Sequence, residues 1–184
     1  MNYNKISIHR IFTVVIILLV ISCQEPEPRK PIARKSSTFL KESVVRNKVI
    51  NTLEENAFKE LMDKDSLNTY MASESGFWYY YQNRDSISTY YPKRGDEVIY
   101  TYEIKDINGT ILYTTEELGE RSYLVDKQEL ITGLQDGIKL MKQGEIVTFL
   151  FPSHKAYGYS GYDKIGSNQP LIYTVNLKQI IVNN

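Results

Sequence analysis

The sequence contains few of the residues that most often carry covalent, redox or metal chemistry. It has one cysteine and two histidines in 184 residues. A single cysteine cannot form a disulfide within the chain, and so few cysteines and histidines do not provide a crowded metal cluster. Lysine plus arginine and aspartate plus glutamate number 22 each, so no excess of positive charge indicates a nucleic-acid partner. The stability of the fold must therefore come from an ordinary apolar core.

Standard catalytic signatures are also missing. The sequence has no Gly-x-Ser-x-Gly motif, no Gly-x-x-x-x-Gly-Lys-Ser/Thr loop, no His-Glu-x-x-His pair and no Gly-x-Gly-x-x-Gly turn. His9 belongs to the N-terminal segment discussed below, and a lone histidine such as His154 is seldom a general base or a metal ligand. The pair Glu116-Glu117 is expected to be solvated charge in a polar loop. Covalent and metal-assisted mechanisms therefore have little support.

Aromatic residues are plentiful, and most of them are tyrosine. The chain has 15 Tyr against 6 Phe and 1 Trp. Tyrosine suits half-buried strands and apolar pockets that need a polar tip. Hydrophobic residues make up 42% and charged residues 24%, which is ordinary globular usage and excludes wholesale disorder.

The first 22 residues have the layout of a secretory signal. Lys5 and Arg10 precede an apolar run over residues 11–21, which is about half of the ~20 residues that a spanning helix needs. The segment Val20-Ile21-Ser22-Cys23 resembles a bacterial lipobox, which implies cleavage before Cys23, diacylglycerol on its sulfur and an acyl chain such as palmitate on the new amino terminus. A buried cysteine in an uncleaved helix is the alternative. The lipid would anchor the chain to a membrane, facing the periplasm, since several acyl chains hold far more tightly than one.

The segment after the signal divides into a tether and a helix. Residues 23–37 are rich in proline and charge, which is typical of an extended tether. Within residues 38–72, apolar residues recur at three-to-five-residue steps from Phe39 to Met62 and predict an amphipathic helix. This helix could pack on the domain that follows or pair with a second copy as a homodimer, and packing is slightly favoured. Because the repeat is not a clean heptad, a long coiled coil is not expected.

Residues 73–184 show the periodicity of strands around one short helix. Strands are predicted over 77–81, 97–104, 110–114, 146–151 and 171–181, with a hairpin turn at Asn108-Gly109. The helical pattern spans 131–142, with Gly144 where a C-cap would fall. This order predicts an α+β fold in which an antiparallel sheet folds over the helix.

An ordered series of motifs in this part resembles the FKBP family of peptidyl-prolyl cis–trans isomerases. The series is Pro92-Lys-Arg-Gly-Asp96, Asn108-Gly109, Gly133-Leu-Gln-Asp-Gly-Ile138, Met141-Lys-Gln-Gly144 and Ala156-Tyr-Gly158. Together with the lipobox, the chain is similar to the gliding-motility-associated FKBP-type lipoproteins. The resemblance implies an antiparallel half-barrel sheet wrapped around the short helix, with a pocket between them.

The resemblance also implies site residues, carried over position by position. Tyr102, Ile131 and Tyr157 match the catalytic positions, with the Ile131 backbone N–H and the Tyr157 hydroxyl holding carbonyls. The positions that match the substrate-binding residues are Leu112, Tyr113, Leu130, Leu134, Ile165 and Tyr173. Leu112-Tyr113 stand where the family usually has Phe-Asp, and Leu134 stands in place of the pocket-floor tryptophan.

The function implied is isomerisation of X–Pro bonds in exported or envelope proteins, with gliding-motility machinery among the expected clients. Rotation about the X–Pro bond faces a barrier of about 18–20 kcal/mol because amide resonance must break. The twisted bond is less polar than either planar isomer, so a dry apolar pocket favours it. No cofactor is required. The alternative is a non-catalytic chaperone or scaffold lipoprotein of a motility or secretion assembly.

Overall fold

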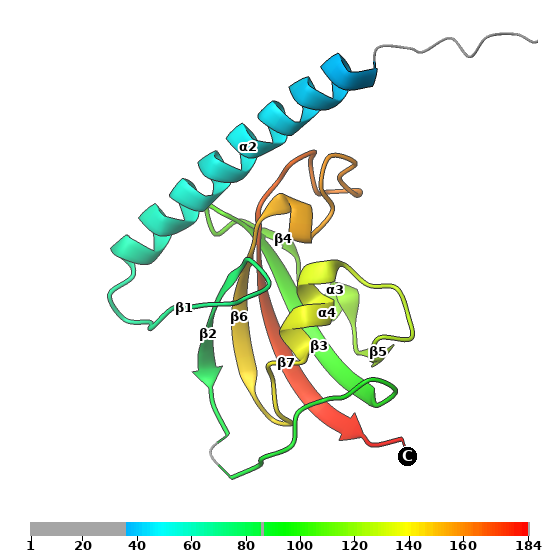
Figure 1. Ribbon diagram of the computed structural model, residues 1–184. Helices are drawn as coiled ribbons and strands as arrows, with labels where there is room; N and C mark the ends of the chain where they lie inside the picture. Colours follow the sequence, from blue (N-terminus) through cyan, green and yellow to red (C-terminus); the bar gives the residue numbers. More distant parts are fainter. Residues whose placement is uncertain (1–35, 86, 184) are drawn as a thin grey trace, which may run out of the picture. The chain divides into compact units, whose positions relative to one another are not determined.

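The structure is a computed structural model that describes residues 36–85 and 87–183 (Figure 1). The predicted signal peptide over residues 1–22, Cys23 and the tether up to residue 35 lie outside the described residues, so they stay predictions. Within the described part of the chain, no helix is long and apolar enough to cross a membrane. Residues from Leu40 onward form one compact unit.

The helices and strands of the described chain follow one another in the order below. They are α2 (Ser36–Lys64), β1 (Met71–Ala72), β2 (Trp78–Asn83), β3 (Glu97–Asp106), β4 (Ile111–Tyr113), α3 (Thr115–Leu118), β5 (Arg121–Leu124), α4 (Thr132–Ile138), β6 (Ile146–Phe151), the 3-10 turn η1 (Ser153–Lys155) and β7 (Leu171–Ile181). Among the described residues, seven strands form one sheet in the order β1-β2-β6-β7-β3-β4, with β5 paired to β3. Every pairing is antiparallel. The predicted α+β class with an antiparallel sheet is confirmed.

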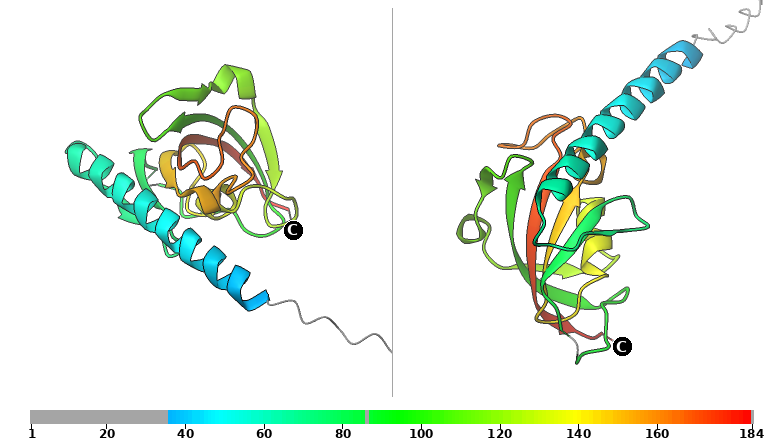
Figure 2. Two further views of the ribbon diagram at one scale, coloured as in Figure 1. Left: turned by 90° about the horizontal axis from the view of Figure 1, so that it is seen from above. Right: turned by 90° about the vertical axis from the view of Figure 1, so that its left-hand side faces the viewer.

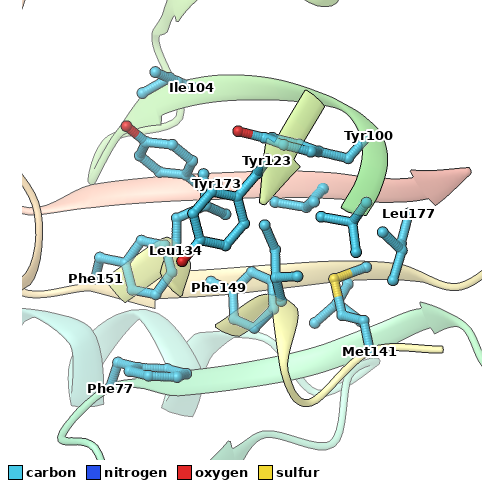
Figure 3. Packing of buried hydrophobic residues seen from close by; sticks show 14 of the residues in the cluster. Phe77, Tyr100, Ile104, Tyr123, Leu134, Met141, Phe149, Phe151, Tyr173 and Leu177 are labelled. Carbon is cyan, nitrogen blue, oxygen red and sulfur yellow. The ribbon is translucent and has the colours of Figure 1, made fainter. Parts of the chain in front are cut away.

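The concave side of the sheet holds the core. Strands β3 and β7 curve around the helices on that side, as the view from above shows (Figure 2). Along β7 every second side chain faces inward, and Leu171, Tyr173, Val175 and Leu177 are each at most 1% exposed. Strand β6 lies between β2 and β7, and its residues 147–151 are all buried. Figure 3 shows how side chains from β3, β6, β7 and α4 meet in this cluster.

Helix α4 lies unusually close to the sheet because two of its residues lack a side chain. A Cβ atom on Gly133 would stand 2.7 Å from Cδ1 of Phe151, and one on Gly137 would stand 2.9 Å from Cε1 of Phe149. Real side chains do not approach that closely, so glycine is required for this packing. Contact between the helix backbone and the two phenylalanine rings therefore sets the depth of the space above the sheet.

The end of this short helix differs from the sequence prediction. The helix ends at Ile138 with Lys139 as its C-cap, so Gly144 is not the C-cap. Two short-range bonds then continue the chain, from Leu140 N–H to the Gly137 carbonyl and from Met141 N–H to the Ile138 carbonyl, at 3.0 Å each. Gly144 instead has φ +85° and donates its N–H to the Leu177 carbonyl at 2.7 Å. Its left-handed backbone turns the chain into β6.

Helix α2 runs from Ser36 to Lys64 and so includes the whole predicted apolar repeat from Phe39 to Met62. The Asp65 carboxylate accepts the Leu67 N–H at 3.1 Å and the Tyr70 hydroxyl at 2.7 Å, and this local turn competes with further helix. Near its C-terminal end the helix packs on the domain, since Phe58 is fully buried and its ring lies 5.9 Å from that of Trp78 in β2. The N-terminal part leaves five apolar side chains more than half exposed: Leu40, Val44, Val45, Val49 and Leu53.

Candidate functional site

The predicted site residues come together around one apolar cluster. Three of them are buried members of that cluster, namely Leu134, Ile165 and Tyr173. The other six are partly exposed and pack against it, namely Tyr102, Leu112, Tyr113, Leu130, Ile131 and Tyr157. Residues that lie up to 71 positions apart, from 102 to 173, thus pack on the same hydrophobic core. The roles assigned to them individually stay predictions.

Tyrosine rings form the wall of this site. Tyr102 in β3 and Tyr173 in β7 stack with their ring centroids 5.7 Å apart and an interplanar angle of 5°. Tyr173 also packs against Phe151 at 5.4 Å, and Tyr102 packs against Tyr100 at 5.6 Å. Strand pairing explains the stack, because Tyr102 is opposite Val175 and Tyr173 is opposite Ile104, which places the two rings diagonally on the same face.

The hydroxyl groups in this wall remain protonated at neutral pH. Burial raises the pKa of Tyr173 above its usual range, and the nearby Tyr157 hydroxyl raises it further. Burial likewise raises the pKa of Tyr102, again with a contribution from Tyr157. The Tyr173 hydroxyl is buried, and the Tyr157 hydroxyl, although near enough to raise its pKa, does not form a hydrogen bond of regular geometry with it; no other described residue is its partner. The wall therefore carries neutral hydroxyl groups in an apolar surrounding, and that of Tyr173 lies out of contact with solvent.

Replacing Tyr173 by phenylalanine is expected to stabilise the protein by about 1 kcal/mol, because a buried hydroxyl without a partner costs free energy. The melting temperature should rise by about 2–4 °C for a chain of this size. The matched control is Tyr123→Phe, since Tyr123 is 2% exposed but its hydroxyl accepts the Asp126 N–H at 3.0 Å. That variant should be destabilised. Thermal unfolding of both variants checks the pair, and equal destabilisation would contradict the unpaired state of the Tyr173 hydroxyl.

The loop over residues 159–169 covers the site with an aromatic side chain that the sequence analysis did not single out. The Tyr162 ring stacks on Tyr157 with centroids 5.4 Å apart and an angle of 16°. Two backbone bonds between Tyr162 and Ile165, both 2.8 Å long, close a tight turn. Gly161 permits it, because a Cβ there would stand 2.5 Å from the Ile165 carbonyl oxygen. This turn sends the Ile165 side chain into the core, where it is 3% exposed.

Tyr113 uses its hydroxyl to hold this same loop. The hydroxyl donates to the Asp163 carboxylate at 2.7 Å and accepts the Lys164 N–H at 3.1 Å. The bond to Asp163 raises the pKa of Tyr113. The Lys164 ammonium lies 4.7 Å from the centre of the Tyr113 ring. A carboxylate thus stands beside the end of β4, but it comes from the loop rather than from the strand.

Glu117 is not simply solvated charge in a loop, as the sequence analysis expected. It occupies the third position of helix α3 and forms a capping box with Thr114, accepting the Thr114 N–H at 2.9 Å while its own N–H donates to the Thr114 hydroxyl. Its second oxygen accepts from the Lys164 ammonium at 3.1 Å. The spacing Thr-x-x-Glu was the signal that could have revealed this helix. Glu117 thereby helps to fix the covering loop.

The start of helix α4 presents a free backbone donor to the site. Ile131 is the N-cap with φ −57° and ψ 137°, and its carbonyl accepts the N–H groups of Leu134 and Gln135 at 3.0 Å each. The Gln135 side-chain amide holds the Leu130 carbonyl at 2.7 Å. The Ile131 N–H donates to no acceptor among the described residues. The geometry therefore leaves the predicted substrate-holding N–H available.

No group of three or more acidic, histidine or cysteine side chains that could hold a metal ion occurs in residues 36–85 and 87–183.

Comparison with known families agrees with this architecture. The family model of the FKBP-type peptidyl-prolyl cis-trans isomerases matches residues 89–178, which run from just before β3 into β7. The chain contains an FKBP-type domain. The FKBP-like half-barrel wrapped around a short helix, with an N-terminal helix before it, is thus confirmed as the fold.

Curated relatives match this domain and little beyond it. The chain is 34% identical over 90 residues to the probable FKBP-type peptidyl-prolyl cis-trans isomerase FkpA of Neisseria meningitidis, covering 48% of this chain and 33% of the relative. It is 37% identical over 87 residues to the peptidyl-prolyl cis-trans isomerase Mip of Coxiella burnetii, covering 47% and 37% respectively. The chain therefore spans about a third of the length of these two relatives.

Solved structures share the fold at lower identity. The crystal structure of FkpA from Escherichia coli aligns with a TM-score of 0.60 and 22% identity, covering 77% of this chain and 64% of that one. A peptidyl-prolyl cis-trans isomerase from Pseudomonas syringae aligns with a TM-score of 0.59 and 18% identity, covering 73% of this chain and 96% of that one. The structural similarity thus extends beyond the segment that the family model matches.

Proposed function

We propose that this protein is a peptidyl-prolyl cis–trans isomerase. The observation that carries the proposal is the gathering of all nine predicted site side chains around one apolar cluster within an FKBP-type domain. Such a cluster disfavours the polar planar isomers of the imide more than the less polar twisted state, which lowers the rotation barrier by differential binding. The chemistry needs no nucleophile and no cofactor.

Each part of the site has a proposed role in this reaction. The proline ring would contact Leu112, Leu134 and the stacked rings of Tyr102 and Tyr173. The Ile131 N–H and the Tyr157 hydroxyl would hold substrate carbonyls beside it. A hydrogen bond between uncharged groups contributes about 1 kcal/mol. Most of the rate enhancement is therefore assigned to the apolar surrounding and to positioning.

The activity is tested by exchange spectroscopy on the purified full chain with a peptide that contains one X–Pro bond. We expect cis–trans exchange of the peptide to be faster than in buffer at a catalytic amount of protein. An unrelated protein at the same concentration is the control. Exchange no faster than in buffer, from protein with a folded circular dichroism spectrum, would reject the isomerase.

We further propose that the protein works in the cell envelope as a lipoprotein. The lipobox-like segment ending at Cys23 supports this proposal, and the lipid would hold the mature chain at the membrane on the periplasmic side. Its clients would be proline-containing exported proteins, with the gliding-motility machinery proposed from the sequence resemblance alone. Sensitivity of processing to globomycin, together with membrane fractionation, tests the anchor.

A second role, as a chaperone or scaffold, is favoured by one surface feature. Val45, Val49 and Leu53 recur at four-residue steps along α2 and are each more than half exposed. Side chains four apart share one face of a helix, so these three form an apolar row that a client or a second copy of the chain could cover. The predicted homodimer through this helix stays a proposal, which light scattering of the same purified chain tests.

A further inference from the structure

A buried carboxylate joins helix α2 to the turn that follows strand β6. Glu54 is 6% exposed and Ser153 is 2% exposed. One oxygen of Glu54 accepts the backbone N–H of Ser153 at 2.8 Å, and the other accepts the Ser153 hydroxyl at 2.6 Å. These two bonds connect residues 99 positions apart in the sequence.

The arrangement satisfies a group that is otherwise costly to bury. A carboxylate removed from water loses its hydration, and the loss is offset only when hydrogen bonds or an opposite charge replace it. No lysine or arginine forms an ion pair with Glu54 among the described residues. The two Ser153 donors therefore supply the replacement, and charged acceptors make such bonds short and strong. Helix α2 is thus fixed to this particular residue of the domain.

Ser153 in turn holds both neighbours of Tyr157. Its carbonyl accepts the Ala156 N–H at 2.9 Å and the Gly158 N–H at 2.8 Å. The Gly158 carbonyl then accepts the Asn168 N–H at 2.8 Å, which connects this turn to the covering loop. Tyr157 stands between the two bonded amides, so the position of its backbone depends on where Ser153 lies.

We propose that Glu54 is a positioning residue for the Tyr157 hydroxyl, acting through Ser153. This inference rests on the proposed isomerase function, because Tyr157 is assigned there to the substrate. On this proposal α2 is part of the functional domain and not a spacer. While α2 is docked, the turn around Tyr157 keeps its position, and when α2 undocks, that turn is no longer fixed. Because the same helix exposes an apolar row, a partner on α2 would influence the rate of isomerisation.

The test compares four variants of the full chain. Glu54→Ala removes both acceptors, whereas Glu54→Gln retains an acceptor for the Ser153 N–H and can donate to the Ser153 hydroxyl. Ser153→Ala removes the hydroxyl bond alone. Glu55→Ala is the matched control, because Glu55 is the exposed neighbour on the same helix. Trp78, the one tryptophan of the chain, contacts Phe58 of α2, so its fluorescence reports whether the helix remains docked.

We expect Glu54→Ala to lower kcat/KM about tenfold, as loss of charge-assisted hydrogen bonds implies. Glu54→Gln should recover most of this loss, Ser153→Ala should show an intermediate loss, and Glu55→Ala should match the wild type. The decisive comparison repeats Glu54→Ala in a Tyr157→Phe background. There the further loss of kcat/KM should be less than about twofold, because the effects of two substitutions that act through one group do not add. An equal loss in both backgrounds would overturn the proposal.

Hydrogen exchange separates this inference from the proposed function. The amides of residues 156–158 should exchange faster in Glu54→Ala than in the wild type, and their unchanged exchange would overturn the positioning role. If the wild type shows no isomerase activity while these amides respond as expected, the proposed function fails and the link from Glu54 to the turn stands. If Glu54→Ala does not fold, Ser153→Ala carries the same comparison, since it retains one of the two bonds.

Discussion

Replacing Gly133 by alanine is expected to destabilise the protein by about 2–3 kcal/mol, because the added methyl group overpacks a rigid core. The new Cβ would lie 2.7–2.9 Å from three atoms of the Phe151 ring. That ring cannot move aside easily, since it stacks on Phe149 at 5.3 Å and meets Phe77 at 5.1 Å. Alanine would gain about 1 kcal/mol in helix propensity, which offsets only part of the cost.

Two other glycines make the prediction specific. Gly137→Ala should have a smaller effect, because its Cβ would meet Phe149 at 2.9–3.3 Å. Gly166→Ala adds the same methyl group where the nearest atom is the Gln169 side-chain oxygen at 3.3 Å, which accepts the Gly166 N–H at 2.6 Å. Only this one hydrogen-bonded side chain has to shift, so the loss of stability should be no more than about 1 kcal/mol. Chemical denaturation of the three variants measures the series. Equal stability of Gly133→Ala and Gly166→Ala would show that α4 does not lie against Phe151.

The strands were predictable because their burial follows the side-chain period of two. The predicted strand 171–181 coincides with β7, and alternation along it puts Leu171 and Leu177 on one face, where both are buried. The predicted strand 146–151 coincides with β6. Here every position is apolar or small, which fits a central strand with both of its faces covered.

The short elements α3 and β1 were not predicted from the sequence, for a different reason. Helix α3 has four residues and strand β1 has two, too few for any periodicity to emerge. Helix α3 is specified instead by its capping box, a local hydrogen-bond signal that a search for hydrophobic period overlooks. The predicted helix over 131–142 is too long, because Leu140 and Met141 continue the apolar pattern although α4 ends at Ile138.

Side-chain bonds between distant segments could not be predicted from one sequence. Tyr113 and Asp163 are 50 positions apart, and Glu54 and Ser153 are 99 apart. Polar residues of these types are usually solvated, so their pairing depends on how the sheet and helices bring them together. The nine residues that match the family's site all lie in or against one hydrophobic core. They were found from the order of the family's motifs, because hydrophobic periodicity alone does not indicate which distant residues lie close together.

Replacing Ile131 by proline is expected to lower kcat/KM about fivefold relative to Ile131→Ala, because the variant loses the backbone N–H proposed to hold a substrate carbonyl. The observed φ of −57° suits proline, and the N–H that proline removes has no acceptor among the described residues. The variant should therefore fold. Ile131→Ala is the matched control, because it removes a similar part of the side chain and keeps the N–H.

The size of this effect distinguishes two kinds of catalysis. Removing an oxyanion-hole donor costs about 10²–10³ in kcat where negative charge develops on the carbonyl oxygen. Rotation about an imide develops no such charge, so the Ile131 N–H should contribute as a neutral hydrogen bond, which is worth about fivefold in rate. Exchange spectroscopy with one X–Pro peptide measures both variants, and thermal unfolding checks that both are folded. Equal kcat/KM for the two variants would show that the Ile131 N–H does not contribute to catalysis, and the apolar wall would then have to account for the rate without it.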